Sequence, residues 1–349
     1  MDLTGYATII VTRNRADALA LSLPLMLTQS RLPQEVLVVD SSDDPAANMA
    51  LVDRLAASTP VPLRHISSPP GMTVQRNIGL AQITAPVVFF PDDDSLVLPG
   101  ALAAMMRIYD LDRAQVVGGV CSAEAKTPPE GVLTDRQATY AMTPADRLRA
   151  RISRLRYAVE ERFFRDPFHR CAAAKYARLP APPPWMESEN AITVPWMTGF
   201  RMSFRTDLIR QRGFDENLGR YALFEDTDAC FGILQSHLLV GARHAQIYHH
   251  KAPARRANGR ALGAMQILNR AYVLARAGCG DAALIAQMQR FARYKIVQYR
   301  LGARGDFGRD RLAGARAALQ AAPALFTAAP DDLTAVYLTL RARCFTTEN

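Results

Sequence analysis

The residues with the clearest chemical potential are carboxylates that follow apolar runs. Asp92, Asp93 and Asp94 come directly after the apolar stretch 87–90. Three adjacent negative charges repel one another, so such a run is favourable where a cation or a basic partner offsets the charge. Carboxylate oxygens are the usual protein ligands of Mg²⁺ and Mn²⁺. The run therefore indicates a divalent-cation site, and the competing interpretation is an acidic turn in solvent.

Two further groups could take part in the same chemistry. Glu225 and Asp226 form a pair of carboxylates, as general acid–base catalysis requires, although acids also cap the N-termini of helices. Asp228 is expected to be the structural acid of this group. His249 and His250 end a strand-like run, and one imidazole could complete a metal site.

The first 120 residues alternate between strand and helix patterns that would position these groups. We expect strands at residues 6–11, 35–40, 62–66, 86–90 and 115–120, and helices at residues 17–27, 49–57, 73–83 and 99–111. In the helix at 73–83, the inward face is predicted to hold Val74, Ile78, Leu80 and Ala81. Continuous apolar strands separated by helices favour a mostly parallel sheet. Asp40 and the run 92–94 would then share the edge where ligands bind.

The rest of the chain predicts an insertion and a helical end. Two proline clusters bracket a basic segment at about residues 126–190, which interrupts a first domain at residues 1–255. Strand-like and helical patterns return after residue 190, and residues 256–349 read as a helical C-terminal region. The chain has no GxGxxG fingerprint and no P-loop motif. Its sequence therefore gives no main support for a dinucleotide-binding enzyme or a P-loop nucleotide-binding protein.

The amino-acid composition limits the class of protein and the cellular location to be expected. The formal charge of +9 and the pI of about 9.6 favour an anionic partner. No apolar run approaches the roughly 18 residues that cross a bilayer, and the N-terminus lacks the features of a signal peptide. The five cysteines are scattered and contain no CxxC pair, which predicts reduced, mostly buried thiols. A cytoplasmic protein is expected.

Seven segments, taken in order, resemble the GT-A glycosyltransferases of family 2. They are "VTRNR" (11–15), "VVDSSDD" (38–44), "GMTVQRNIG" (71–79), "FFPDDDSLVLP" (89–99), "GFRMSFRTDLIRQRGFDENL" (199–218), "FEDTD" (224–228) and "YHH" (248–250). The resemblance covers roughly residues 5–250. It departs from the family pattern at Val11, Arg13 and Pro91, and none of these changes removes a charged group that the chemistry needs.

The resemblance implies an α/β GT-A fold: a Rossmann-like, nucleotide-binding mixed sheet flanked by helices, with a helical C-terminal region. It also implies an inverting, metal-dependent transfer from a nucleotide-sugar, most readily a UDP-sugar, to a saccharide or a lipid-linked saccharide in polysaccharide or glycolipid synthesis. The cofactor would be Mn²⁺ or Mg²⁺, bound at the DXD motif. The implied catalytic residues are Asp226 and Glu225, and the acceptor would lie beside Trp196 and Gly199. The implied nucleotide-binding residues are Val11, Thr12, Arg13, Arg15, Asp40, Arg76, Asp92 and Asp93. The implied metal ligands are Asp94, His249, Asp92 and His250, with His249 favoured over His250.

Other interpretations stay open at this point. A nucleotidyltransferase on a related sheet would use paired acids but would not need the late "FEDTD" and "YHH" segments. A basic nucleic-acid-binding protein is suggested by net charge alone, and the acidic strand ends argue against it. In the insertion, Arg147, Arg151, Arg154 and Arg162 fall on one helical side. That side could contact the inner face of an anionic membrane or a diphosphate-lipid acceptor, or it could be an ordinary solvated helix.

Overall fold

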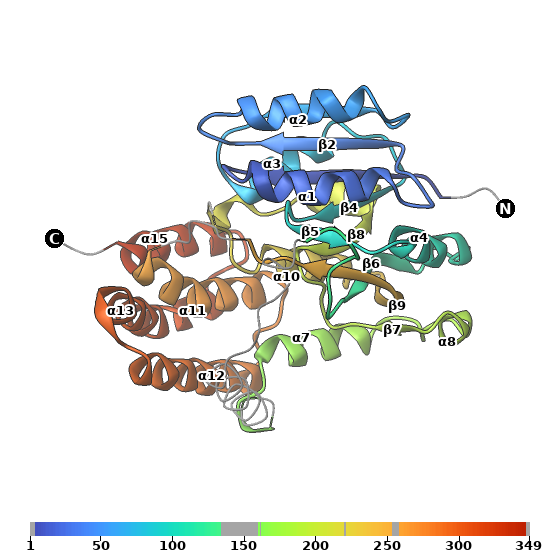
Figure 1. Cartoon of the computed structure of the whole chain (residues 1–349). Coiled ribbons are helices and arrows are strands. Elements are labelled where there is room, and N and C mark those ends of the chain that lie inside the picture. The colour runs from blue at the N-terminus through green and yellow to red at the C-terminus, as the bar shows by residue number, and fades with distance from the viewer. Residues whose placement is uncertain (1–3, 134–159, 161, 220, 253–257, 347–349) are drawn as a thin grey trace, which may run out of the picture. The chain divides into compact units, whose positions relative to one another are not determined.

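A computed structural model describes residues 4–133, 160, 162–219, 221–252 and 258–346 (Figure 1). The chain forms two compact units: residues 1–138 with 175–254, and residues 139–174 with 255–349. Part of the predicted insertion therefore groups with the C-terminal helices.

The first unit is built on a nine-stranded sheet. The strands follow the spatial order β3-β2-β1-β4-β8-β6-β9-β5, and β7 pairs with β9. The strands are β1 (Tyr6–Thr12), β2 (Glu35–Asp40), β3 (Leu63–Ser67), β4 (Val87–Pro91), β5 (Ser95–Val97), β6 (Val117–Glu124), β7 (Ala191–Thr193), β8 (Arg201–Arg205) and β9 (Leu238–His249). The helices of this unit are α1 (Ala16–Leu27), α2 (Ala46–Ala56), α3 (Met72–Leu80), α4 (Ala101–Leu111), α8 (Trp185–Ser188), α9 (Thr206–Arg212), η1 (Glu216–Leu218) and α10 (Glu225–Ile233).

The sheet is mixed, as the resemblance implies, and only half of it is parallel. Strands β3, β2, β1 and β4 run parallel to one another, whereas β8 lies antiparallel between β4 and β6. The strand pattern of the first 120 residues predicts β1, β2, β3, β4 and β6, but it does not report the antiparallel pairing of β8 with β4 and β6. The short β5 was missed because it pairs antiparallel with β9, about 150 residues later in the chain.

The central strands are buried along almost their whole length, as a sheet covered on both faces requires. Tyr6 and Ile10 of β1 belong to the same core as Leu19 and Leu23 of α1. On the other face, α3 approaches β1 so closely that a Cβ at Gly79 would lie 2.7 Å from Ile9 Cγ2. A glycine is therefore needed at this contact.

The predicted inward face of the third helix is wrong. In α3 the side chains of Val74 and Ile78 are only partly buried, and Ala81, just beyond the helix, is exposed. The buried residues are Thr73, Gln75, Arg76, Gly79 and Leu80. Apolar periodicity fails here because α3 buries a polar side, whose members bond to strand ends and to acids elsewhere in the first unit.

The second unit is helical. Its helices are most of α7 (Pro167–Tyr176), α11 (Gly259–Arg276), α12 (Ala282–Leu301), α13 (Gly305–Ala321), α14 (Pro323–Thr327) and α15 (Leu333–Phe345). Among the residues that the structure describes, no helix combines the length and the apolarity that a membrane crossing requires.

The prediction of five reduced cysteines is wrong for two of them. Cys171 and Cys279 form a disulfide within the second unit, with their Cα atoms 5.7 Å apart. They are separated by 108 residues, and no local spacing pattern reports such a pair. Cys121, Cys230 and Cys344 are free and buried. The cysteines therefore no longer support the expectation of a cytoplasmic protein.

Of the four arginines predicted to share one side of a helix in the insertion, the structure describes one. Arg147, Arg151 and Arg154 lie outside the described residues. Arg162 is described: it is exposed, and its guanidinium carbon lies 5.7 Å from the centre of the Phe163 ring.

Candidate active site

The predicted nucleotide edge of the sheet is formed by adjacent strand ends. Thr12, the last residue of β1, pairs in register with Asp40, the last residue of β2. Val11 forms an isolated parallel bridge with Asp92, just beyond β4. Gln75 of α3 ties this edge together by donating hydrogen bonds to the carbonyl oxygens of Thr12 (3.0 Å) and Val39 (2.7 Å).

A tight turn separates the three aspartates of the acidic run. The backbone N–H of Asp92 donates to Ser95 Oγ (3.0 Å), and the Ser95 N–H donates back to the Asp92 carbonyl (3.1 Å). Ser95 Oγ also donates to the carbonyl of Phe200 (2.8 Å). Asp92 stays partly exposed, whereas Asp93 and Asp94 are buried. The turn therefore directs the carboxylates apart, and basic side chains offset part of their repulsion.

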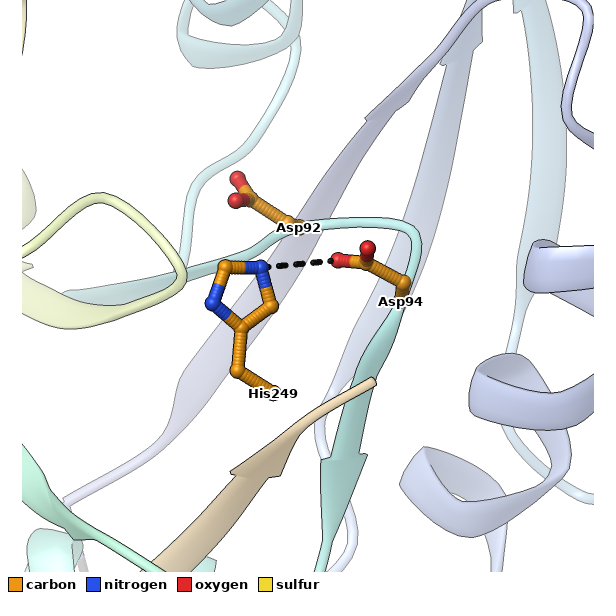
Figure 2. A group of neighbouring side chains, drawn as sticks. All are labelled: Asp92, Asp94 and His249. Atoms are coloured by element: carbon orange, nitrogen blue, oxygen red, sulfur yellow. Dashed lines mark ion pairs between the residues drawn. The ribbon is translucent and has the colours of Figure 1, made fainter. Parts of the chain in front are cut away.

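Asp92, Asp94 and His249 form a group whose potential ligand atoms all lie within 4.8 Å of one another (Figure 2). His249 Nε2 lies 3.4 Å from Asp94 Oδ1. The ring of His249 is stacked on Phe200, with the ring centres 4.4 Å apart, so its orientation is constrained. Among the described residues, Asp94 Oδ1 is buried without a hydrogen-bond partner. The donor set is two carboxylates, one of which carries this unsatisfied oxygen, and one imidazole. Such a set fits Mn²⁺ or Mg²⁺.

His250 is placed differently from His249. Its backbone N–H donates to the Asp94 carbonyl (3.1 Å), and its side chain is not part of the group in Figure 2. The geometry therefore favours His249 as the nitrogen ligand.

Arg15 lies against the acidic run. Its Nη1 is 2.7 Å from Asp93 Oδ1, and its Nη2 is 2.5 Å from Asp94 Oδ2. The Ala252 N–H also donates to Asp94 Oδ2 (3.0 Å), and Thr12 Oγ1 donates to Asp93 Oδ2 (2.8 Å). Sequence reasoning gave Arg15 and Asp93 to the nucleotide, but here each is engaged with other side chains.

These contacts separate the pKa values of the two neighbouring acids. For Asp94, burial raises the pKa, but the adjacent His249 imidazole and the charge of Arg15 outweigh it and hold the pKa at about 2. For Asp93, burial dominates over Arg15 and Thr12 and raises the pKa to about 7. Asp94 is the acid that stays ionised, as a metal ligand must be.

The second acidic pair opens helix α10. Asp226 Oδ2 accepts a hydrogen bond from the Gly199 N–H (3.0 Å), and Oδ1 accepts one from the Thr227 N–H (2.6 Å). Glu225 Oε1 accepts one from Arg76 Nη1 (2.7 Å). A Cβ at Gly199 would lie 3.2 Å from Glu225 Oε1, so a side chain there would crowd the pair.

Arg76 connects the two acidic groups. Its Nη2 lies 3.5 Å from Asp92 Oδ1, while its Nη1 pairs with Glu225. The side chain is only 1% exposed, and its guanidinium carbon lies 5.2 Å from the centre of the Phe214 ring. A buried arginine with two carboxylate partners is the element that brings residues 92 and 225 into one site.

The environment raises the pKa values of the Glu225–Asp226 pair. Burial, followed by the neighbouring charge of Asp226, raises the pKa of Glu225 to about 8, although Arg76 lowers it in part. Burial also raises the pKa of Asp226, against the hydrogen bonds from Thr227 and Gly199. Carboxylates with raised pKa values are suited to accepting protons near neutral pH. Asp228 instead pairs with Arg212 (2.9 Å), which fits the structural role expected for it.

The surroundings of Asp40 include a residue that sequence reasoning set aside. Asp40 Oδ2 lies 3.1 Å from His65 Nε2 and accepts a hydrogen bond from Asn48 Nδ2 (2.8 Å), while Oδ1 accepts one from the Ser42 N–H (2.8 Å). His65 is not among the site residues predicted from the sequence. Its position near the end of the strand beside β2 was the available signal.

Two other predicted residues lie at the periphery of these contacts. Arg13 is turned outward and pairs with Asp43 Oδ1 (2.9 Å) at an exposed position. Trp196 is partly buried, three residues before Gly199.

Comparisons with known proteins agree with this architecture. Residues 8–169 match the family model described as "Glycosyl transferase family 2". The mannosyltransferase PcManGT from Pyrobaculum calidifontis, solved with GDP-Man and Mn²⁺, has a TM-score of 0.50 and 17% identity, covering 97% of this chain and 86% of that one. Residues 1–349 of S. aureus TarS, solved with UDP-GlcNAc, have a TM-score of 0.52 and 13% identity. The match covers 97% of this chain and 90% of the TarS chain. No curated protein sequence matches the chain.

The chain therefore has the fold of the GT-A glycosyltransferases. The match to the family 2 glycosyltransferases covers residues 8–169, just under half of the chain. The rival interpretations as a nucleotidyltransferase or a nucleic-acid-binding protein receive no support from these comparisons.

Proposed function

We propose that the chain transfers a sugar from a nucleotide-diphosphate sugar to an acceptor hydroxyl, with inversion at the anomeric carbon. The observation that carries the proposal is the Arg76 bridge, which joins a cation-binding donor set to a buried carboxylate pair with raised pKa values. A metal-assisted departure and a base-assisted attack need two such groups in one site.

The residues of the site divide the chemistry as follows. Asp92, Asp94 and His249 would hold Mn²⁺ or Mg²⁺, which would neutralise the charge that develops on the departing diphosphate. Asp226 accepts the proton of the acceptor hydroxyl as its oxygen attacks the anomeric carbon from the face opposite the diphosphate. Gly199 N–H and Thr227 N–H hold the Asp226 carboxylate in place, and Glu225 and Arg76 orient the pair.

The donor and the acceptor are proposed at the level of chemical class. Asp40, with Thr12 and the Val11 backbone, lies at the strand edge where a nucleotide would bind. The two structural relatives hold GDP-Man and UDP-GlcNAc, and we favour a UDP-sugar for this chain. A saccharide or lipid-linked saccharide acceptor, beside Trp196 and Gly199, would place the enzyme in polysaccharide or glycolipid synthesis.

A donor panel tests this proposal directly. The purified protein, with Mn²⁺ or Mg²⁺, is expected to hydrolyse one class of UDP-, GDP- or dTDP-sugars slowly in the absence of acceptor. The release of nucleoside diphosphate measures the reaction. If none of these sugars binds or is hydrolysed with either metal, the proposal is wrong.

The pKa values predict how the transfer depends on pH. Asp226 must be ionised to accept a proton, and the raised pKa values keep the Glu225–Asp226 pair partly protonated near neutral pH. We therefore expect kcat/KM to rise with pH through the neutral region, with a slope of up to about one decade per pH unit below the apparent pKa. An activity profile from about pH 5 to about pH 9 measures this; a profile flat from pH 5 upward would contradict the assignment.

Arg15 allows a prediction about metal affinity. A cation that shares the Asp94 carboxylate with Arg15 is repelled by it, and charges about 5 Å apart interact by about 3 kcal/mol per unit charge at an effective dielectric constant of 20. The hydrogen bond that Arg15 gives Asp94 contributes only about 1–3 kcal/mol, and the Ala252 N–H remains. Arg15→Gln should therefore tighten Mn²⁺ binding by about tenfold or more. Titration calorimetry without nucleotide measures it, and weaker binding in this variant would show that orientation outweighs repulsion.

A further inference from the structure

The positive charge of the chain is concentrated in its C-terminal part. Residues 255–349 contain 15 Arg and Lys against 6 Asp and Glu, which accounts for the whole formal excess of +9. Residues 282–305 of this region contain no acid; they cover all of α12 and contain five basic residues. The excess therefore belongs to the second unit, whereas the acidic strand ends belong to the first.

Helix α12 presents two different sides. One side is buried within the helical unit through Leu284, Met288, Phe291 and Ala292. The helix lies along α13 in this unit (Figure 1). The opposite side is exposed and repeats at spacings of three and four residues. We call it the α12 face: Arg290, Arg293, Val297, Arg300 and Leu301.

The α12 face combines unpaired cations with exposed aliphatic side chains. Val297 is 54% exposed and Leu301 is 80% exposed. Within the described chain, no ion pair joins Arg290, Arg293 or Arg300 to a carboxylate, whereas the partly buried Lys295 on the flank is paired with Glu160. Val297 and Leu301 lie four residues apart on the helix, so they form one exposed apolar strip among the arginines rather than scattered single residues.

We infer that the α12 face docks on an anionic lipid bilayer. Arginines attract the headgroups, while Val297 and Leu301 enter the acyl boundary, as interfacial amphipathic helices do. The neighbouring segment adds an aromatic group of the same kind. Phe163 is 68% exposed, and it is fixed beside α12 because the adjacent Phe164 stacks on Tyr294 with ring centres 4.3 Å apart.

The exposed aliphatic groups favour a bilayer over a nucleic acid. A nucleic acid would satisfy the arginines but provides no apolar phase for Val297 and Leu301; its binding surfaces use aromatic stacking and phosphate contacts. The inference is independent of the proposed transfer chemistry, because every residue of the α12 face lies in the second unit.

Vesicle co-sedimentation tests the inference on the full-length protein. Vesicles of phosphatidylcholine with about 30% phosphatidylglycerol should bind the wild type at low salt, and vesicles of phosphatidylcholine alone should not. Each arginine near an anionic surface contributes about fivefold in affinity, so R290Q/R293Q/R300Q should bind roughly 100-fold more weakly. A control with the same charge change, R54Q/R113Q/R316Q, alters exposed arginines elsewhere and should bind nearly as the wild type does.

A second variant separates the bilayer from other partners. V297S/L301S should lose vesicle binding by about tenfold or more while keeping its affinity for heparin or RNA. The inference is overturned if the wild type does not sediment with anionic vesicles at low salt, if the two triple variants bind alike, or if V297S/L301S binds vesicles as tightly as the wild type. If ultracentrifugation shows a wild-type dimer that V297S/L301S dissociates, the face is a self-association surface and the inference is also wrong.

Discussion

Replacement of Asp226 by Asn is expected to lower sugar transfer by a factor of ~10²–10⁴, the usual contribution of a general base. The asparagine side chain keeps the size of the aspartate and one oxygen, so it retains one of the two hydrogen bonds that Gly199 N–H and Thr227 N–H give to separate carboxylate oxygens. It cannot take up a proton from the acceptor hydroxyl. The loss should therefore fall on turnover, while the affinity for the donor stays within a few-fold of the wild type. Steady-state kinetics and donor titration measure the two quantities separately.

The matched control is Asp53→Asn, which removes the same charge from an exposed position on α2. It should change neither turnover nor thermal stability by more than a small amount. If Asp226→Asn keeps near-normal turnover with correct product, the assignment of Asp226 as the base is wrong. NMR of the product tests the stereochemistry independently, and retention at the anomeric carbon would contradict the proposed direct displacement.

Asp94→Asn is expected to abolish metal-dependent nucleotide binding. Loss of a residue that only orients a metal ligand commonly costs 10–100-fold in affinity, so the loss of the ligand itself should cost at least ~100-fold. Asp94 Oδ1 faces His249 and is buried without a hydrogen-bond partner among the described residues, so its charge is directed at the candidate metal position. Calorimetry with nucleoside diphosphate and Mn²⁺ measures the effect.

The chain supplies two internal controls for the metal site. Asp93→Asn changes the adjacent acid, which faces Thr12 and Arg15, and should leave the Mn²⁺ affinity within about tenfold of the wild type. His249→Ala should weaken Mn²⁺ binding by about tenfold or more, and His250→Ala should do little, because only His249 belongs to the group in Figure 2. Equal affinities for the Asp94 variant and the wild type would show that the metal binds elsewhere or not at all.

Local patterns in the sequence were enough to predict the α/β class and the positions of most of the strands and acids that border the candidate site. Continuous apolar strands are a local signal, and an acid that follows such a strand must lie at the edge of the sheet. The register of Thr12 with Asp40 and the bridge from Val11 to Asp92 place the predicted residues side by side. The start of helix α10 at Glu225 could also be predicted, because acids in the first turn of a helix complement the helix dipole.

The pairing of each acid with a particular arginine could be seen only in the folded chain. Arg15, Arg76 and the aspartates of the run could pair in several ways, and the choice depends on directions set by the Asp92–Ser95 turn and by Gly199. The polar buried side of α3 contradicts apolar periodicity for the same reason, since Gln75 and Arg76 are stabilised by partners far away in the sequence. The disulfide between Cys171 and Cys279 joins residues 108 apart. Local patterns report a residue's neighbours along the chain, whereas these pairings depend on distances that exist only after the chain has folded.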